Sequence, residues 1–568
     1  EGAWPERLQG PERWSLDETF DGRDAHLDAE AERLATSIAD AAAVAPGGAN
    51  FADLNALRLR YAAVKWLRVV AWFERHAERD DREPITFHGD TSRDDEYQAL
   101  LTAIAESTGR AFAIAHAASR SLATTASPPA NPLWRRLLGR LFASNRSPRR
   151  RAGPRVLLCG NLRILAPVCE ELLRQGAEPV WLYDRFAVGA LRRRMHGVRQ
   201  LVCNSSEATS HDFPSRLLQR PVRRGDVDLS ASVEAWYRRA VAQFGPAQAR
   251  LHHAVAQHVE RLRPDYVVVD EDATPLPRAI LACARRRGAR TIAVQHGVCG
   301  IRFGFVPQQA DVCCVWDRAS ARQLTVWGIS ADRIRVTGSP YVEAMLQEVA
   351  ALRTRRPAHD RTSRPLRIAV VGAPPPRDDR PDAVEFRWTS QAYAELTDAA
   401  FGALAARADV EVWVRPHPRA ASDPHWARGV ARLPSASVRD VSHLSQAECL
   451  AGVDGVLSFP SSLGVEAARA GLPVVLLMPA RAGAILPAAW YGLRGPASTE
   501  REITAAIDDL VARRGRSSSA FAGTDLSMPR DSARRIVDVV FDREPTDAAR
   551  FDVDDATAAK STEALHGR

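Results

Sequence analysis

Near-continuous apolar runs alternate with helical segments along most of this 568-residue chain. Such runs occupy residues 156–160, 179–183 and 266–270, and each is followed by apolar positions spaced three or four residues apart. Apolar runs without alternation indicate strands that are buried on both faces, and the spacing between the runs indicates helices. The pattern therefore predicts a parallel sheet covered by helices, in a Rossmann-like domain over residues 155–350.

The same rhythm begins again after residue 365 and predicts a second Rossmann-like domain over residues 366–540. Its strands are predicted at residues 366–372, 410–414, 438–441, 455–458 and 473–477. The predicted fold class is thus α/β, with two doubly wound units in tandem that face a cleft. In such sheets ligands bind at the carboxyl ends of the strands.

Residues 1–130 are predicted to form a mainly helical N-terminal region. Residues 54–74 carry apolar side chains at helical spacing with arginines between them, which is typical of an amphipathic helix. Residues 85–87 and 112–114 are predicted as short strands that flank a helix through 97–107. This region has no recognisable chemical signature.

Three further segments depart from the alternating pattern. Residues 131–154 form a basic linker whose arginines act either as a solvated connector or as a contact with anionic lipid or a polyanionic acceptor. Residues 204–247 are predicted to be an insertion with a helix near 233–244. Residues 541–568 form a polar tail.

Composition places the chain among globular proteins and argues against a metal site. Hydrophobic residues make up 45% of the chain and charged residues 26%, and the net charge is +8. The eight cysteines include no CxxC pair, so we expect small core residues in a reducing cytosol and no metal. No apolar run approaches the roughly 20 residues of a spanning helix. A cytoplasmic location is expected, with an additional peripheral contact at the inner face of the cell membrane.

The second domain contains a candidate phosphate site where one predicted strand passes into a helix. Ser461, Ser462 and Gly464 lie at this junction, where hydroxyls, backbone N–H groups and the helix dipole favour an anion. Glu466 lies one turn later and is predicted to accept hydrogen bonds from ribose hydroxyls. The serines have an alternative role as helix caps.

The neighbouring strand of the same domain ends in Arg415-Pro-His417-Pro. Arg415 would supply positive charge to the phosphates, and His417, held between two prolines, would donate to a phosphate oxygen or protonate a leaving phosphate. A turn histidine with a structural hydrogen bond is the alternative. Together the two segments predict a binding site for a nucleotide, most simply that of an activated sugar.

The first domain carries candidate general bases at two predicted strand ends. Asp270 and Glu271 follow one strand, and His296 with Gly297 follows the next. A carboxylate or an imidazole at this rim would take the proton of an acceptor hydroxyl, and Gly297 would let a ligand approach the backbone. The alternatives are that Asp270 caps the next helix and that His296 hydrogen-bonds a loop carbonyl.

These motifs resemble those of the GT-B glycosyltransferases of bacterial surface polysaccharides. The resemblance covers about residues 155–500 and rests on the order of the Gln295-His-Gly297, Arg415-Pro-His-Pro418 and Ser461-Ser462 motifs. Within that fold the chain is most similar to the CDP-glycerol glycerophosphotransferase, capsule Kdo-transferase and bacterial polysialyltransferase groups. In the last of these a Gly follows the acidic pair, whereas Asp272 stands here.

The resemblance implies transfer of a sugar or alditol phosphate from a nucleotide donor to a glycan or lipid-linked acceptor. The donor, CMP- or CDP-linked in these groups, would be a substrate, and no cofactor, metal or nucleic acid is implied. The base would be Asp270, Glu271 or His296. Two rival functions are a non-hydrolysing nucleotide-sugar 2-epimerase, whose amino-terminal Gly-Thr-Arg-Pro-Glu signature is absent, and a non-catalytic component that binds glycan or nucleotide.

Overall fold

A computed structural model describes most of the chain in two compact units. The first unit comprises Glu1–Val294 and Phe303–Cys313, and the second comprises Gln295–Arg302 and Cys314–Arg568. Most of the predicted linker and tail lie outside the described residues. The described residues are 25–44, 48–76, 85–89, 94–109, 112–116, 153–183, 198–203, 213–300, 302, 304–355, 364–374, 390–418, 423–479, 491, 493–512 and 528–543.

The first predicted sheet is present and has a doubly wound strand order. Its strands are β3 (Arg155–Cys159), β4 (Glu178–Tyr183), β5 (Arg199–Val202), β8 (Tyr266–Val269), β9 (Arg290–Val294), β10 (Val312–Val315) and β11 (Ile334–Val336). They are ordered β11-β10-β9-β8-β3-β4-β5, and β3 pairs in parallel with both β4 and β8. The direction of winding therefore reverses between β3 and β8, where doubly wound folds bind ligands.

The helices of the first unit include one that is longer than predicted. The helix expected near residues 233–244 is α9 (Ser230–Leu262), which continues through Pro246. It packs against α10 (Pro275–Arg285) and α5 (Asp94–Thr108), so tertiary contacts along its whole length support it. The predicted insertion is thus continuous with the helix that leads into β8.

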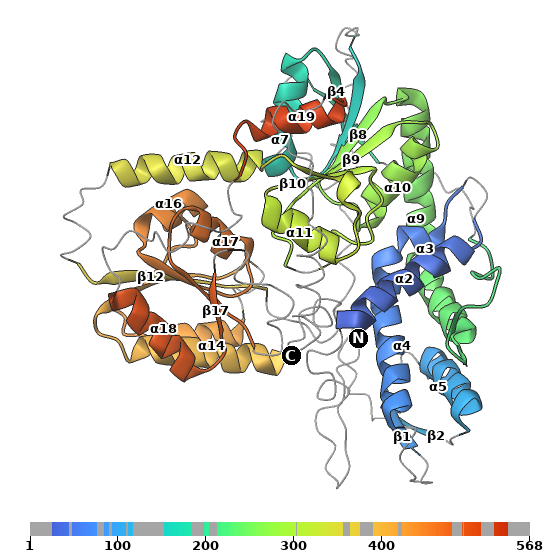
Figure 1. Cartoon of the computed structure of the whole chain (residues 1–568), viewed down its shortest axis with the longest axis horizontal. Helices are drawn as coiled ribbons and strands as arrows, with labels where there is room; N and C mark the ends of the chain where they lie inside the picture. The colour runs from blue at the N-terminus through green and yellow to red at the C-terminus, as the bar shows by residue number, and fades with distance from the viewer. Residues whose placement is uncertain are drawn as a thin grey trace, which may run out of the picture. The chain divides into compact units, whose positions relative to one another are not determined.

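The N-terminal region is mainly helical, as predicted, and belongs to the first unit. It contains α2 (Ala25–Ala41), α3 (Phe51–Leu54), α4 (Ala56–His76) and α5. Helices α2 and α4 lie side by side (Figure 1). Strands β1 (Ile85–Gly89) and β2 (Phe112–His116) pair in parallel on either side of α5, which confirms the predicted strand–helix–strand order.

The second sheet has the same winding. Its strands are β12 (Leu366–Val371), β13 (Val410–Arg415), β14 (Val438–Asp440), β15 (Gly455–Ser458), β16 (Val474–Leu477) and β17 (Arg494–Ala497). They are ordered β14-β13-β12-β15-β16-β17, and every neighbouring pair is parallel. The reversal here falls between β12 and β15.

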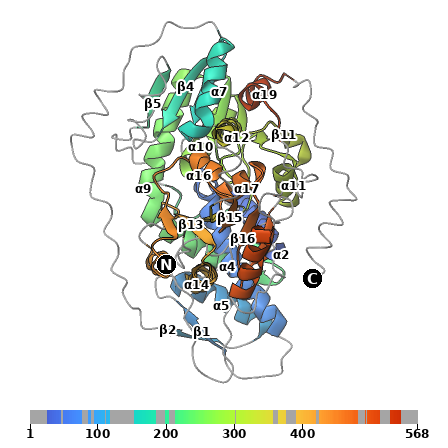
Figure 2. The ribbon, with the colours of Figure 1, turned by 90° about the vertical axis from the view of Figure 1, so that its left-hand side faces the viewer.

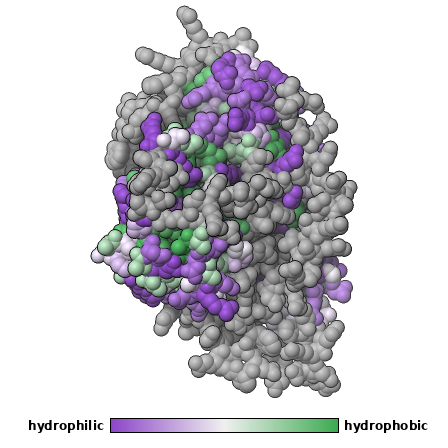
Figure 3. Space-filling view, turned by 60° about the vertical axis from the view of Figure 1, so that its left-hand side comes forward, coloured by the Kyte–Doolittle hydropathy of each residue, from purple (hydrophilic) through white to green (hydrophobic). Residues whose placement is uncertain are grey.

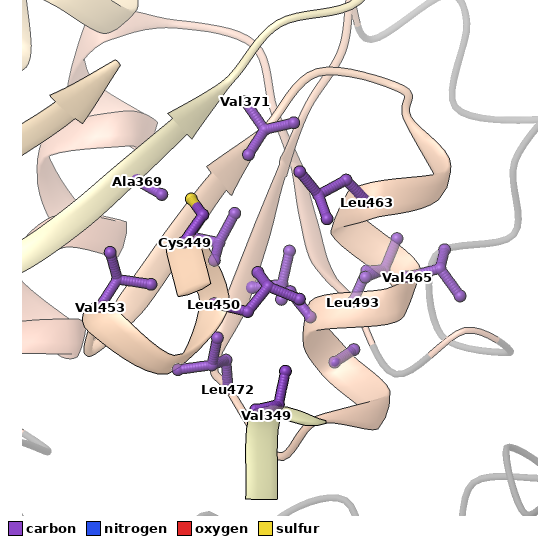
Figure 4. Close-up of a cluster of buried hydrophobic side chains, with 14 of the residues drawn as sticks. Val349, Ala369, Val371, Cys449, Leu450, Val453, Leu463, Val465, Leu472 and Leu493 are labelled. Carbon is purple, nitrogen blue, oxygen red and sulfur yellow. The ribbon is translucent and has the colours of Figure 1, made fainter. Parts of the chain in front are cut away.

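Helices cover both faces of the second sheet. Ile368 and Val370 of β12 pack into a core with α14 (Ser390–Ala405) and α18 (Glu500–Ala512). The alternate residues of β12 face a second core, shared with α16 (Gln446–Gly452), α17 (Ser462–Arg469) and α12 (Pro340–Thr354) (Figure 4). The strands accordingly lie between α16 and α17 on one side and α14 on the other (Figures 1 and 2). This two-sided burial explains the near-continuous apolar runs in the sequence.

The last described helix, α19 (Ser532–Val540), is held by the start of α12. Both carboxylate oxygens of Glu343 accept hydrogen bonds at its N-terminus, from the backbone N–H groups of Asp531 and Ser532, each at 3.1 Å. A carboxylate at this position also interacts favourably with the helix dipole.

The described residues have the polar surface and the buried cysteines of a folded α/β protein. Described residues on the face in Figure 3 are largely hydrophilic, with smaller hydrophobic areas. All eight cysteines are buried and free, as predicted. Among the described helices, none has both the length and the apolar character needed to cross a bilayer. The sheets confirm two Rossmann-like units in tandem, the architecture expected of a GT-B type chain.

Candidate functional site

Three neighbouring strands, β13, β12 and β15, end in register at the point where the winding of the second sheet reverses. Val371 of β12 pairs with Arg415 of β13 on one side and with Ser458 of β15 on the other. The hydrogen bonding continues one step further, because Gly372 N donates to Arg415 O and Phe459 N donates to Val371 O, each at 3.0 Å. The two sequence-predicted motifs, which follow β13 and β15, therefore emerge from one edge of this sheet, roughly 10 Å apart at an interstrand spacing of about 4.8 Å.

The loop that carries His417 passes close to the end of β12. A Cβ atom on Gly372 would lie 3.1 Å from His417 N and 3.1 Å from the ring of Trp426, so only glycine fits there without a shift. His417 itself is partly exposed. The imidazole is thus carried by a braced backbone at the reversal point, where a ligand is expected.

The start of α17 presses directly against the end of β15. A Cβ atom on Gly464 would lie 2.3 Å from Ser458 Oγ, so any larger residue at position 464 would displace the helix from the strand. Ser461 caps the helix, since its Oγ accepts from Leu463 N at 3.3 Å, and both Ser461 and Ser462 are partly exposed. Capping explains Ser461. Leu463 N and Gly464 N both donate to Ser461, so the partly exposed Ser462, with its hydroxyl and backbone N–H group, is what this helix start offers an anion.

Of the predicted ligand-binding side chains, Arg415 is partly exposed and bound to a loop, and Glu466 is buried. Arg415 Nη1 donates to the carbonyls of Val441 and Leu444, each at 2.9 Å, and so holds the loop between β14 and α16. Glu466 is only 1% exposed, among buried neighbours on α17. Arg415 therefore lies at the edge that carries His417 but is engaged by the protein backbone, and Glu466 is buried within α17.

The turn that carries His296 belongs to the second unit and is braced by Gln295. The buried Gln295 side chain donates from Nε2 to Gly297 O at 2.7 Å and accepts from Trp316 N at 2.8 Å. His296 and Gly297 are partly exposed. Val298 packs against the core that contains α17, so this turn and the serine motif share one hydrophobic core.

Asp270 lies at the reversal point of the first sheet. It follows β8, whose last residue, Val269, pairs with Cys159 of β3. Asp270 is 8% exposed, and its Oδ2 accepts from Asn161 N at 2.7 Å. Burial raises the pKa of the Asp270 carboxyl to about 6, against which the hydrogen bond from Asn161 acts. A carboxyl with such a pKa is suited to proton transfer near neutral pH.

The two acidic residues after Asp270 are engaged by the polypeptide backbone. Glu271 Oε2 accepts from the backbone N–H groups of Ala273 at 2.7 Å and Thr274 at 2.9 Å, just before α10. Glu271 therefore holds the turn that leads into α10. Asp272 is buried, and burial raises its pKa to about 6 although the positive charge of Arg278 opposes the shift.

One buried ion pair was not predicted from the sequence. Arg469, in the last turn of α17, pairs with Asp317, and their side chains are 2% and 0% exposed. Asp317 also caps α11 (Arg318–Val326), because its Oδ1 accepts from Ser320 N at 2.7 Å. The only local signal was an aspartate just before a helical segment, which predicts a cap but not its partner.

No metal centre is evident in the part of the chain that the structure describes, because no group of three or more His, Cys, Asp or Glu side chains is placed to hold an ion there.

Comparisons with known proteins find fold-level likenesses only. No protein-family model and no curated protein matches this chain. A solved structure described as a UDP-N-acetylglucosamine 2-epimerase from Listeria monocytogenes is 13% identical, with 69% of this chain and 98% of that chain covered and a TM-score of 0.47.

Two further solved structures match at a similar level. The Neisseria meningitidis UDP-GlcNAc 2-epimerase bound to UDP-GlcNAc is 11% identical, over 68% of this chain and 100% of that chain, with a TM-score of 0.45. MurG from Acinetobacter baumannii is 14% identical, over 68% and 99%, with a TM-score of 0.40. Because these TM-scores are below 0.5, we assign the fold from the strand order of the two sheets and not from these likenesses.

Proposed function

We propose that this chain is a glycosyltransferase that moves a sugar or alditol phosphate from a nucleotide donor to a surface polysaccharide acceptor. The observation that carries the proposal is the reversal point of the second sheet, where the segments that carry His417 and the partly exposed Ser461 and Ser462 follow strand ends in register. Ligands of doubly wound sheets bind at such points. The resemblance of the motifs to GT-B enzymes of surface polysaccharide synthesis identifies the ligand class.

In the proposed mechanism the donor phosphates bind at the start of α17. The backbone N–H group and the hydroxyl of Ser462 would hold phosphate oxygens, and the helix dipole would favour their charge. His417 would donate to the same phosphates. These groups would stabilise the nucleotide as it leaves, when its negative charge is greatest.

The acceptor hydroxyl requires a base, and His296 and Asp270 remain candidates. His296 is supported by its braced turn, which packs on the core of the donor-binding unit. Asp270 is supported by its place at the first reversal point and by its raised pKa. Glu271 is the weakest candidate, because two backbone N–H groups already occupy one of its oxygens.

Donor and acceptor identities extend the proposal by resemblance. A CMP- or CDP-linked donor and a glycan or lipid-linked acceptor fit the enzyme groups whose motifs this chain shares. Such an acceptor would place the enzyme in the cytoplasm, with a peripheral contact at the inner face of the membrane. Arginines between residues 131 and 154 would supply positive charge for that contact.

Binding of cytidine nucleotides tests the donor site. CMP or CDP is expected to raise the melting temperature, whereas Ser462→Ala, which removes one phosphate ligand, is expected to weaken the response several-fold. The measurement is thermal unfolding with CMP, CDP, UDP, GDP and ADP. Ser442→Ala, at an exposed serine of the same unit, is the matched control. A response to UDP alone would contradict the cytidine donor, and no response to any nucleotide would contradict the donor site.

Two histidine substitutions test the transfer step. His296→Ala and His417→Ala are each expected to reduce transfer by roughly tenfold or more with the fold intact. Only His417→Ala should also weaken nucleotide binding, because His417 is assigned to the phosphates. Acceptor-dependent nucleotide release measures transfer, and His443→Ala, at an exposed histidine of the second unit, is the control.

The same assay separates the rival functions. Conversion of the donor without an acceptor would identify an epimerase. Nucleotide binding without any turnover would identify a binding component. Full transfer activity in both His296→Ala and His417→Ala would exclude these histidines from the mechanism.

A further inference from the structure

The buried guanidinium of Arg278 joins three distant segments of the first unit. It lies on α10 with its side chain 3% exposed. Nη1 donates to Asp272 O at 2.9 Å and to Pro307 O at 3.1 Å, and Nη2 donates to Asp53 Oδ1 at 2.7 Å. Asp53 belongs to α3 of the N-terminal region, so one side chain connects that region with the acidic rim after β8 and with the loop around Pro307.

The hydrogen bonds around Arg278 form a ring that includes Asp53, Gln309 and Asp272. Asp53 also accepts from the Gln309 side chain, through its second carboxylate oxygen. The backbone N–H groups of Gln309 and Ala310 donate to Asp272 Oδ2 at 2.6 and 3.0 Å. Asp53 is therefore linked to Asp272 by two routes, through Arg278 and through Gln309, and both routes restrain the position of Asp272.

An independent apolar contact reaches the same rim. Leu57 and Tyr61 of α4 form a buried cluster with Ala273, the residue that follows Asp272. Leu57 is 9% exposed and Tyr61 is 4% exposed. The N-terminal region thus packs directly on Ala273 and reaches Asp272 through the hydrogen bonds of Arg278 and Gln309.

We infer that the N-terminal region is part of the acceptor side of the enzyme, with Asp53 as a positioning residue for the rim that carries Asp270. Ligands of doubly wound sheets bind at this reversal point, so a rim fixed from α3 and α4 would determine how an acceptor glycan presents its hydroxyl. This inference rests on the proposed function for the identity of the ligand. The hydrogen bonds that link Asp53 to Asp272 do not depend on the proposed function.

The first arm of the test measures the restraint itself. In the full chain, Asp53→Ala is expected to speed hydrogen exchange at least tenfold in peptides that cover residues 270–274 and 304–310, and to leave exchange in β12 and β15 unchanged. Asp40→Ala, an exposed aspartate of α2, is the matched control. If hydrogen exchange in these peptides is the same in Asp53→Ala and wild type, the inference is overturned, irrespective of the protein's catalytic activity.

The second arm measures the consequence for the reaction. Asp53→Ala is expected to raise the acceptor KM at least tenfold, with the donor KM and nucleotide-induced stabilisation within twofold of wild type. Asp53→Asn, which keeps one acceptor for Arg278 Nη2, should recover part of the loss. Leu57→Ala should act in the same direction. Faster exchange with an unchanged acceptor KM would overturn the acceptor role, and equal loss of donor and acceptor binding would show general destabilisation instead. If no nucleotide binds and no transfer occurs, the proposed function fails while the exchange result still stands.

Discussion

Replacement of Asp317 by alanine is expected to lower the free energy of unfolding by about 3–5 kcal/mol, the usual cost of leaving one partner of a buried ion pair alone. Arg469 would remain as a charge with a 2% exposed side chain. The substitution also removes the cap of α11, which adds about 1 kcal/mol. Chemical unfolding followed by circular dichroism measures the change.

The surroundings of Arg469 explain why the loss should be large. Its guanidinium lies 5.2 Å from the centre of the Trp316 ring, and its Nε and Nη1 atoms are buried with no hydrogen-bond partner among the described residues. Burial lowers the pKa of Arg469 to about 10, which still leaves the group charged at neutral pH. The carboxylate of Asp317 is thus the main compensation for this buried charge.

A set of substitutions separates the charge from the cap. Asp317→Ser retains an N-cap oxygen, so its cost should reflect the lost charge. Adding Arg469→Met removes the stranded guanidinium and should recover most of that loss, because apolar replacements of buried ion pairs are often neutral or stabilising. A cost below about 1 kcal/mol for Asp317→Ser would show that the pair contributes little in solution.

The positions of the sheets could be predicted from the sequence, whereas the order of their strands could not. Apolar runs such as 266–269 and 366–371 are long enough to identify strands buried on both faces. Their order depends on which strands pair across long loops, and spacing along the chain does not encode that. Helix α9 exceeded its prediction because packing against α5 and α10 supports the helix through Pro246.

The candidate site was predictable where a motif follows a strand. His417 and Ser461 are found at a reversal point because the carboxyl ends of parallel strands share one edge. The partners of individual side chains were not predictable. Asp317 and Arg469 are 152 residues apart in the chain, and Asp53 and Arg278 are 225 apart. Such contacts follow from the folded arrangement and leave no local sequence signal.

Asp270→Asn is expected to stabilise the protein at pH 8, by about 3 kcal/mol, while it abolishes transfer if Asp270 is the base. Burial raises the pKa of Asp270 from 3.8 to about 6. A difference of about two pKa units corresponds to about 3 kcal/mol between the two protonation states. The ionised carboxylate therefore carries a cost in stability that the neutral amide avoids.

The raised pKa of Asp270 makes the stability of the wild-type protein depend on pH. Between pH 3.8 and about 6 the folded state holds a proton that the unfolded state has released, so this group lowers the free energy of unfolding as pH rises. Below that window both states are protonated and the cost vanishes, and above it the cost is complete. The advantage of Asp270→Asn over wild type should consequently grow from pH 4 to pH 7 and then level off.

An exposed aspartate provides the control, and activity decides between the two candidate bases. Asp226→Asn, in the turn between β6 (Arg223–Arg224) and β7 (Val227–Asp228), should give no pH-dependent gain. A gain for Asp270→Asn with lost transfer would make Asp270 the base, held ionisable near neutral pH at the expense of stability. A gain with full transfer would assign the base to His296. The absence of any gain would show that the carboxylate is stabilised in the folded state by more than the hydrogen bond from Asn161.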